Sequence, residues 1–168
     1  MVKKINLLIV TFFYTGHIKV ASGTFASLFT SIILFIIFRF SISIEIFLTI
    51  FLSIFVIFFY SLIAIKYLKN EFKEVDASEI VIDEVVGQMI PIIMIEFINF
   101  LKFNTFGADI SLYIVSFFLF RFFDIFKPFF IRYFDENFKN SFGVMFDDVL
   151  AGIYTSLTIF LLTIYKLV

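Results

Sequence analysis

Long apolar stretches alternate with short polar segments along most of this chain. The stretches cover roughly Thr24 to Phe40, Ile42 to Ile65, Val85 to Leu101, Ile110 to Phe126 and Val149 to Val168. Most of them approach the length of about 20 residues that a helix needs to cross a bilayer. The first is short and polar residues follow it closely, so it either crosses or pairs with the second as a shallow hairpin. The pattern predicts an all-α membrane bundle of about four to five helices in one domain, residues 1–168.

Composition supports a membrane protein. Of 168 residues, 62% are hydrophobic and thirty are Phe, and the mean hydropathy is +1.10. A chain of this size cannot hide so many apolar side chains in one soluble core. The net charge of −1 gives no basic surface for nucleic acid, and the absence of cysteine excludes disulfides, thiolate metal sites and a cysteine nucleophile.

The N-terminal segment has two interpretations. Lys3 and Lys4, an apolar centre over 5–13 and Val20-Ala21-Ser22 resemble a cleavable signal peptide. His17 and Lys19 interrupt that pattern close to the expected cleavage point. We therefore favour a retained helix that lies in the membrane interface.

The apolar stretches also predict a topology. If all five cross, segments 1–23, 66–84 and 127–148 lie on one side of the membrane. Most lysines and arginines lie in these segments, whereas Arg39, Lys102 and Lys166 lie opposite. Because basic residues favour the cytoplasmic side, this face is expected to be cytoplasmic.

Carboxylates are concentrated at the ends of the apolar stretches, on this same face. Asp76, Glu79 and Asp83 follow i, i+3, i+7, which predicts one stripe of a helix, with Glu84 about 100° further round. Asp147 and Asp148 directly precede the last stretch. Acids beside a bilayer are costly, which favours a functional role. Alternatively, one of the last two acids caps a helix.

Positive charge accompanies these acids. Arg121, Asp124 and Lys127 are spaced by three, so they form a second stripe; Arg121 and Asp124 either serve a site or merely neutralise each other. Carboxylates without cysteine, and with His17 as the only histidine, indicate an all-oxygen site for Mg²⁺ before Ca²⁺ or Mn²⁺. The cations would then bind a phosphate bridged to that metal, so the substrate is expected to be a phosphorylated lipid.

A glycine-containing loop precedes the first stretch. Gly16 to Lys19 followed by Gly23 to Leu28 fits a loop that presents backbone N–H groups and hydroxyls to a phosphate at a helix start. It lacks the order of residues of a nucleotide P-loop, and by itself the pattern fits a simple turn before a helix better.

Together, four segments resemble the phosphatidylglycerophosphatase A family. The residues that carry the resemblance occur in family order from residue 16 to 152: Lys19 with Gly23-Thr24 and Ser27-Leu28; Asp76 with Ile80-Val81-Ile82-Asp83-Glu84 and Gly87; Phe120 to Asp124 with Lys127-Pro128; and Gly143 with Met145, Asp147-Asp148 and Ala151-Gly152. Departures at Ser22, Ala26 and Ala77, where the family usually has Pro, Gly and Pro, affect loop geometry and no charged group.

The resemblance implies an all-helical, Mg²⁺-dependent phosphatase of phospholipid biosynthesis. It would remove the terminal phosphate from phosphatidylglycerophosphate and leave phosphatidylglycerol at the inner (cytoplasmic) face of the bacterial inner membrane. The catalytic residues would be Asp83, Asp124, Asp147 and Asp148. The same four residues would bind the metal together with Asp76, Glu79 and Glu84. The phosphate would be bound by Lys19, Thr24, Ser27, Arg121 and Lys127.

Several questions stay open at the level of sequence. The nucleophile is either a water activated by the metal or an aspartate. An alternative function is a small ion-coupled transporter in which intramembrane carboxylates carry protons or cations. A structural membrane subunit would explain the hydropathy but not the paired acids. The oligomeric state is not determined by the sequence.

Overall fold

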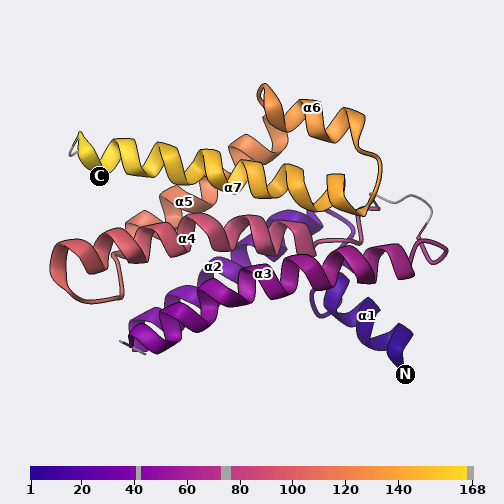
Figure 1. Cartoon of the computed structure of the whole chain (residues 1–168), viewed down its shortest axis with the longest axis horizontal. Helices are drawn as coiled ribbons and strands as arrows, with labels where there is room; N and C mark the ends of the chain where they lie inside the picture. The colour runs from indigo at the N-terminus through magenta and orange to yellow at the C-terminus, as the bar shows by residue number, and fades with distance from the viewer. Residues whose placement is uncertain (41–42, 73–76, 166–168) are drawn as a thin grey trace.

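The computed structural model describes residues 1–40, 43–72 and 77–165, and all regular structure in this part of the chain is helical (Figure 1). In chain order the elements are α1 (Val2–Val10), the 3-10 turn η1 (Thr15–His17), α2 (Ser22–Phe40), α3 (Ile44–Tyr67), α4 (Ile82–Phe103), α5 (Ile110–Phe126), α6 (Phe130–Asn137) and α7 (Ser141–Ile164). The predicted all-α architecture is confirmed.

Four of these helices, α2, α3, α4 and α7, are long and apolar enough to cross a membrane. The fifth, α5, has 17 residues, which corresponds to about 25 Å of helix. The predicted number of membrane helices is therefore confirmed. Only 11% of the apolar span of α3 is buried in the protein, against 56% for α4. Helix α4 is thus the centre of the bundle, and α3 is the most exposed to lipid.

Polar segments far apart in the sequence meet at one end of the bundle. The Val81 N–H donates to the Val10 carbonyl at 3.1 Å, and the Ser22 hydroxyl donates to the Ser78 carbonyl at 2.7 Å. Lys127 at the end of α5 pairs with Asp147 of α7. The segments predicted to share one side of the membrane therefore do lie together.

The start of α4 differs from the prediction. Ile80 N–H donates to the Ala77 carbonyl in a turn, and the helix begins only at Ile82. Glu79 thus lies in the preceding loop, and the predicted helical stripe through Glu79 and Asp83 is wrong. The hydrogen bond from Val81 to the N-terminal segment explains why the helix does not extend further back. Asp76 lies outside the described residues.

The start of α7 also differs from the prediction. The helix begins at Ser141, earlier than the apolar stretch, and the Asn140 side chain caps it by accepting from the N–H groups of Phe142 and Gly143. An Asn side chain in this position satisfies N–H groups that have no partner within the helix. Asp147 and Asp148 therefore lie well inside α7, so the alternative that one of them caps the helix is wrong.

Two glycines let α4 and α7 pack backbone to backbone. A Cβ on Gly152 would collide with the Gly87 carbonyl, and a Cβ on Gly87 would lie 2.7 Å from the Asp148 carbonyl oxygen. Small residues at a helix contact permit this close approach in membrane proteins. The contact holds the Asp148 backbone directly against α4, one turn from its acidic start.

Candidate active site

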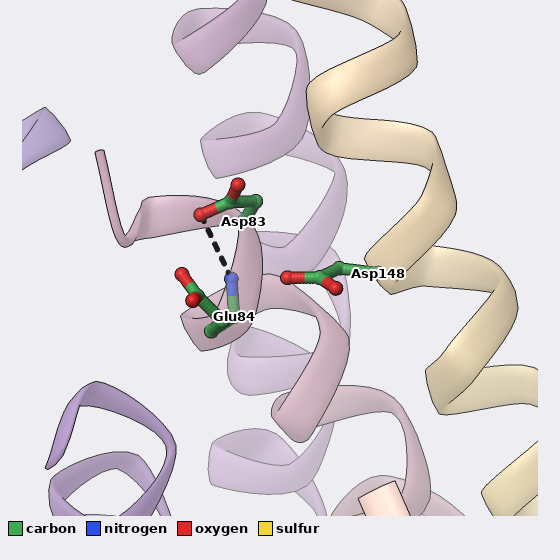
Figure 2. A group of neighbouring side chains, drawn as sticks. All are labelled: Asp83, Glu84 and Asp148. Carbon is green, nitrogen blue, oxygen red and sulfur yellow. Dashed lines mark hydrogen bonds between the residues drawn. The ribbon is translucent and has the colours of Figure 1, made fainter. Parts of the chain in front are cut away.

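Three carboxylates from two helices converge at the polar end of the bundle. Asp83 and Glu84 come from the first turn of α4, and Asp148 comes from α7 (Figure 2). One oxygen of each lies within 4.8 Å of the others. We call these three residues the acidic cluster. Their convergence confirms that distant parts of the sequence assemble one site.

The cluster is largely shielded from solvent. Asp83 and Asp148 are 7% and 4% exposed. Glu84 packs against Gly23 at the start of α2, where a Cβ would collide with the Glu84 carboxylate. Glycine at this position therefore lets the first turn of α2, with its N–H groups, approach the acids closely.

Arg121 of α5 is the cation next to the acidic cluster. Its NH1 atom lies 2.5 Å from Asp124 Oδ2 and 3.9 Å from Glu84 Oε1. The Arg121–Asp124 ion pair that the sequence suggested is present, and Arg121 also lies close to Glu84. Among the described residues, three buried atoms here have no hydrogen-bond partner: Glu84 Oε2, Arg121 Nε and Arg121 NH1, of which NH1 lies in the ion pair with Asp124. A donor and an acceptor are thus left over in the same site.

The local charge is unbalanced. Asp83, Glu84 and Asp124 all interact electrostatically with Asp148, while Arg121 is the cation paired with this group. Buried carboxylates without enough compensating positive charge are strongly unfavourable. A hard divalent cation prefers several carboxylate oxygens, and it would use the acceptor that Glu84 leaves unpaired. The residues present therefore fit Mg²⁺.

A polar cavity of about 540 Å³ opens beside the acidic cluster. Loop residues before α2, the loop before α4 and Arg121 of α5 surround it. Of the predicted site residues, those that line it are Lys19, Glu79, Asp83, Glu84 and Arg121. His17, from the glycine-containing loop that the sequence suggested, lines the same cavity. Ser78 lines it too, and the sequence carries no signal for this residue because its position depends on the fold of the loop before α4.

Lys127 and Asp147 form a second charged group next to the first. Lys127 adopts a left-handed conformation (φ 43°) at the end of α5, where Pro128 stops the helix. Its Nζ donates to Asp147 at 2.6 Å and to Asp135 of α6 at 2.7 Å. Burial lowers the pKa of Lys127, but the Asp147 and Asp135 carboxylates outweigh it and raise the pKa above its ordinary value. Lys127 therefore stays charged and ties α5, α6 and α7 together.

Two predicted phosphate-binding residues lie beside the cavity rather than in its lining. Ser27 is fully buried, and its hydroxyl donates to the Gly23 carbonyl one turn earlier in α2. Thr24 is half-buried in the first turn of the same helix. Asp135, which the sequence did not indicate as a site residue, forms an ion pair with Lys127, as Asp147 does.

Comparison with known proteins agrees with this arrangement. The model of a family described as phosphatidylglycerophosphatase A matches residues 8–163. The chain belongs to this family. The predicted family is therefore confirmed. The match includes the acidic cluster, Arg121 and both glycines of the α4–α7 contact.

Two relatives show how far the similarity extends. A phosphatidylglycerophosphatase A of Haemophilus influenzae is 42% identical over 92 residues, which is 55% of this chain and 50% of that protein. The match thus spans about half the length of that relative. A Bacteroides thetaiotaomicron protein named "Putative phosphatidylinositol-3-phosphatase" is 36% identical over 153 residues, 91% of this chain and 90% of that protein. No solved structure matches the chain.

Proposed function

We propose that this protein is an Mg²⁺-dependent lipid phosphatase that hydrolyses phosphatidylglycerophosphate to phosphatidylglycerol and inorganic phosphate. The observation that carries the proposal is the convergence of Asp83, Glu84 and Asp148 within 4.8 Å beside a polar cavity. Family membership over residues 8–163 supports the same chemistry. A bundle with helices of membrane-spanning length suits a substrate that is itself a membrane lipid.

The acidic cluster would hold the metal ion. When bound, Mg²⁺ supplies Lewis-acid stabilisation of charge on the phosphoryl oxygens and helps to orient the reacting groups. Asp83 and Asp148 sit on opposite helices of the α4–α7 contact, so the packing of those helices sets the distance between them. This rigidity would keep the ligand oxygens organised before the substrate binds.

Arg121 and the start of α2 would bind the phosphoryl group. The unpaired Nε of Arg121 offers a buried donor, and Asp124 orients the guanidinium through its ion pair. The N–H groups at the start of α2 lie next to Glu84, and helix N-termini bind anions through such groups. Lys19, in the cavity lining, would attract the anionic head group. Charge that develops on the phosphoryl oxygens during transfer would thus meet preorganised donors.

The site would face the cytoplasm. Lys3, Lys4, Lys66 and Lys69 belong to the segments at the polar end of the bundle, and an excess of basic residues favours the cytoplasmic side. A lipid phosphate lies at the membrane surface, which is also the depth at which polar helix ends emerge from the hydrocarbon. The phosphate could therefore reach the cavity without leaving the interface.

The transporter alternative receives less support. It needs acids that can exchange ions along a path through the membrane. Glu96, the acid deepest in α4, instead accepts hydrogen bonds from the N–H groups of Gly107 and Ala108 and from the Tyr113 hydroxyl. A carboxylate held by three donors serves the fold rather than ion exchange.

The proposal is tested by phosphate release from purified protein in lipid vesicles. Phosphatidylglycerophosphate, phosphatidylinositol 3-phosphate and phosphatidic acid are compared, with Mg²⁺ and with EDTA. We expect Mg²⁺-dependent release, fastest from phosphatidylglycerophosphate. Faster release from phosphatidylinositol 3-phosphate, which the name of the Bacteroides relative suggests as a comparison, would change the proposed substrate. Release that EDTA leaves intact would refute the metal requirement.

Matched variants connect the activity to the site. Asp83→Asn and Asp148→Asn each remove one charge from the acidic cluster and should abolish release. Asp109→Asn removes the same charge from an exposed side chain at the opposite end of the bundle, where Asp109 makes no side-chain cap to α5. This control should behave like the parent protein. Activity in the cluster variants at the level of the control would contradict the site assignment.

A further inference from the structure

A second lipid-binding feature lies on the other face of α7, away from the acidic cluster. An apolar groove of about 720 Å³ runs between α3, α4 and α7. On α7 it is lined by Phe146, Val149, Ile153 and Ser156, whereas Asp148 and Gly152 face the helix contact described above. The groove and the polar cavity have no lining residue in common.

A basic pocket lies beyond the groove at the polar end of the bundle. Its lining includes Lys66 and Lys69 from the end of α3, and Lys139 and Asn140 from the segment before α7. The side chains of all three lysines are exposed, and none forms a salt bridge with an acid among the described residues. The positive end of the α7 dipole adds to their charge. Because the whole chain has a net charge of −1, this concentration of positive charge is local.

One aromatic ring connects the groove with the basic pocket. Phe142 lines the pocket, and its ring centroid lies 6.4 Å from that of Phe58 and 4.9 Å from that of Phe146, both of which line the groove. An apolar channel along membrane-spanning helices thus ends in cationic side chains at the depth of the head groups. An apolar groove that leads to a basic pocket fits a single phospholipid molecule, with its acyl chains in the groove and its phosphate among the lysines.

We propose that the α3–α4–α7 groove and the pocket of Lys66, Lys69 and Lys139 together bind an anionic phospholipid at a site separate from the active site. Basic clusters at the membrane surface attract anionic lipids. A second copy of the chain is a poorer occupant. A symmetric pair through this face would bring the two lysine groups to the same depth and close together, where they repel each other.

The absence of tryptophan from the chain permits a direct test. Phe55→Trp places a single fluorophore in the groove, and Phe118→Trp places one on the lipid-facing side of α5; both phenylalanines are exposed, at 50% and 65%. The proteins are reconstituted in phosphatidylcholine vesicles. A small fraction of the lipid is then replaced by phosphatidylglycerol or phosphatidylcholine with brominated acyl chains, which quench a nearby tryptophan.

We expect brominated phosphatidylglycerol to quench the tryptophan of the Phe55→Trp protein to the extent that a local enrichment of this lipid by about tenfold would produce. Three lysines near a membrane surface attract anionic lipid strongly enough for such an enrichment. Brominated phosphatidylcholine should show no enrichment, and neither lipid should be enriched at position 118. Adding Lys66→Ala, Lys69→Ala and Lys139→Ala to the Phe55→Trp protein should remove the preference. Adding Lys4→Ala, Arg39→Ala and Lys102→Ala instead, which removes the same charge elsewhere, should not.

Three results would overturn the proposal. The first is equal quenching at position 55 by the two lipids, which would mean an ordinary lipid-exposed surface. The second is a preference for phosphatidylglycerol that survives loss of the three lysines. The third is that neither lipid quenches the tryptophan at position 55, which would mean that another protein molecule covers the groove. None of these measurements depends on catalysis, so the inference stands or fails independently of the proposed function.

Discussion

Glu96 and the acidic cluster are both buried acids in the same bundle, but their surroundings differ. Glu96 is fully buried, and its two oxygens accept from two backbone N–H groups and the Tyr113 hydroxyl at 2.6–3.0 Å. Glu96 therefore anchors the loop between α4 and α5 to α4. In the acidic cluster, one oxygen of each of three carboxylates lies close to the others, and Glu84 Oε2 has no hydrogen-bond partner in the described part of the chain.

The difference separates acids that hold the fold from acids that need a ligand. A buried carboxylate with three donors is satisfied by the protein itself. Converging carboxylates repel one another, and a bound cation would relieve that repulsion. Asp83, Asp148 and Glu96 are all buried, so the donors around the carboxylate are the feature that distinguishes Glu96.

The largest expected effect is on catalysis, from Glu84→Gln. This change removes one charge and keeps the shape of a side chain that packs on Gly23. We expect phosphate release to fall about a thousandfold, because metal binding and charge stabilisation are lost together. Without Mg²⁺ the variant should be as stable as the parent or more stable, since repulsion within the acidic cluster decreases. Thermal unfolding followed by circular dichroism checks the second part, and a large loss of stability would contradict it.

A smaller catalytic loss is expected from Gly152→Ala. The added methyl group collides with the Gly87 carbonyl, so α7 and α4 must separate and carry Asp148 away from Asp83. A shift of roughly 1 Å in such a site costs about a hundredfold in rate. Ser156→Ala, one turn further along α7, is the control and should retain activity. Parent-like rates for Gly152→Ala would mean that the helix contact does not set the geometry of the site.

Glu96→Gln should give the opposite profile from Glu84→Gln. The amide replaces one acceptor by a donor and leaves an N–H or the Tyr113 hydroxyl unpaired. The expected cost is about 2 kcal/mol of unfolding free energy. Activity per folded molecule should match the parent. If Glu96→Gln instead abolished activity without loss of stability, the contrast between the two acidic regions would be wrong.

The smallest effect is expected from Lys127→Met, which tests the charged group beside the acidic cluster. The variant loses the links from α5 to Asp147 and Asp135 but keeps all three cluster acids. Supporting interactions around a metal site are worth about tenfold to a hundredfold, and we expect the lower end of that range in phosphate release. Lys102→Met, which changes an exposed lysine at the end of α4, serves as the control. A complete loss of activity in Lys127→Met would give Lys127 a direct role in phosphate binding, as the sequence first indicated.

Much of this site was accessible from the sequence because its signals are local. The lengths of the apolar stretches determined which polar segments meet, and the spacing of Arg121 and Asp124 predicted their ion pair. Residue types alone indicated a hard cation. These features depend on helix geometry and hydropathy, which act over a few turns.

The rest depended on contacts between distant segments. Glu79 leaves the predicted helix because Val81 bonds to the N-terminal segment, and Asn140 rather than an aspartate caps α7. Lys127 pairs with Asp135, which lies on a short helix that the apolar pattern did not indicate. Nor did spacing distinguish Glu96 from the cluster acids, because its partners come from the next loop.

Binding of Mg²⁺ in the absence of any substrate tests the central claim most directly. Calorimetric titration of the purified protein in detergent should show saturable binding in the parent and in Asp109→Asn. Asp148→Asn should bind at least about tenfold more weakly, because one of three carboxylate ligands loses its charge. Equal affinity in the parent and Asp148→Asn, or no binding in the parent, would contradict the assignment of Asp83, Glu84 and Asp148 as one metal site.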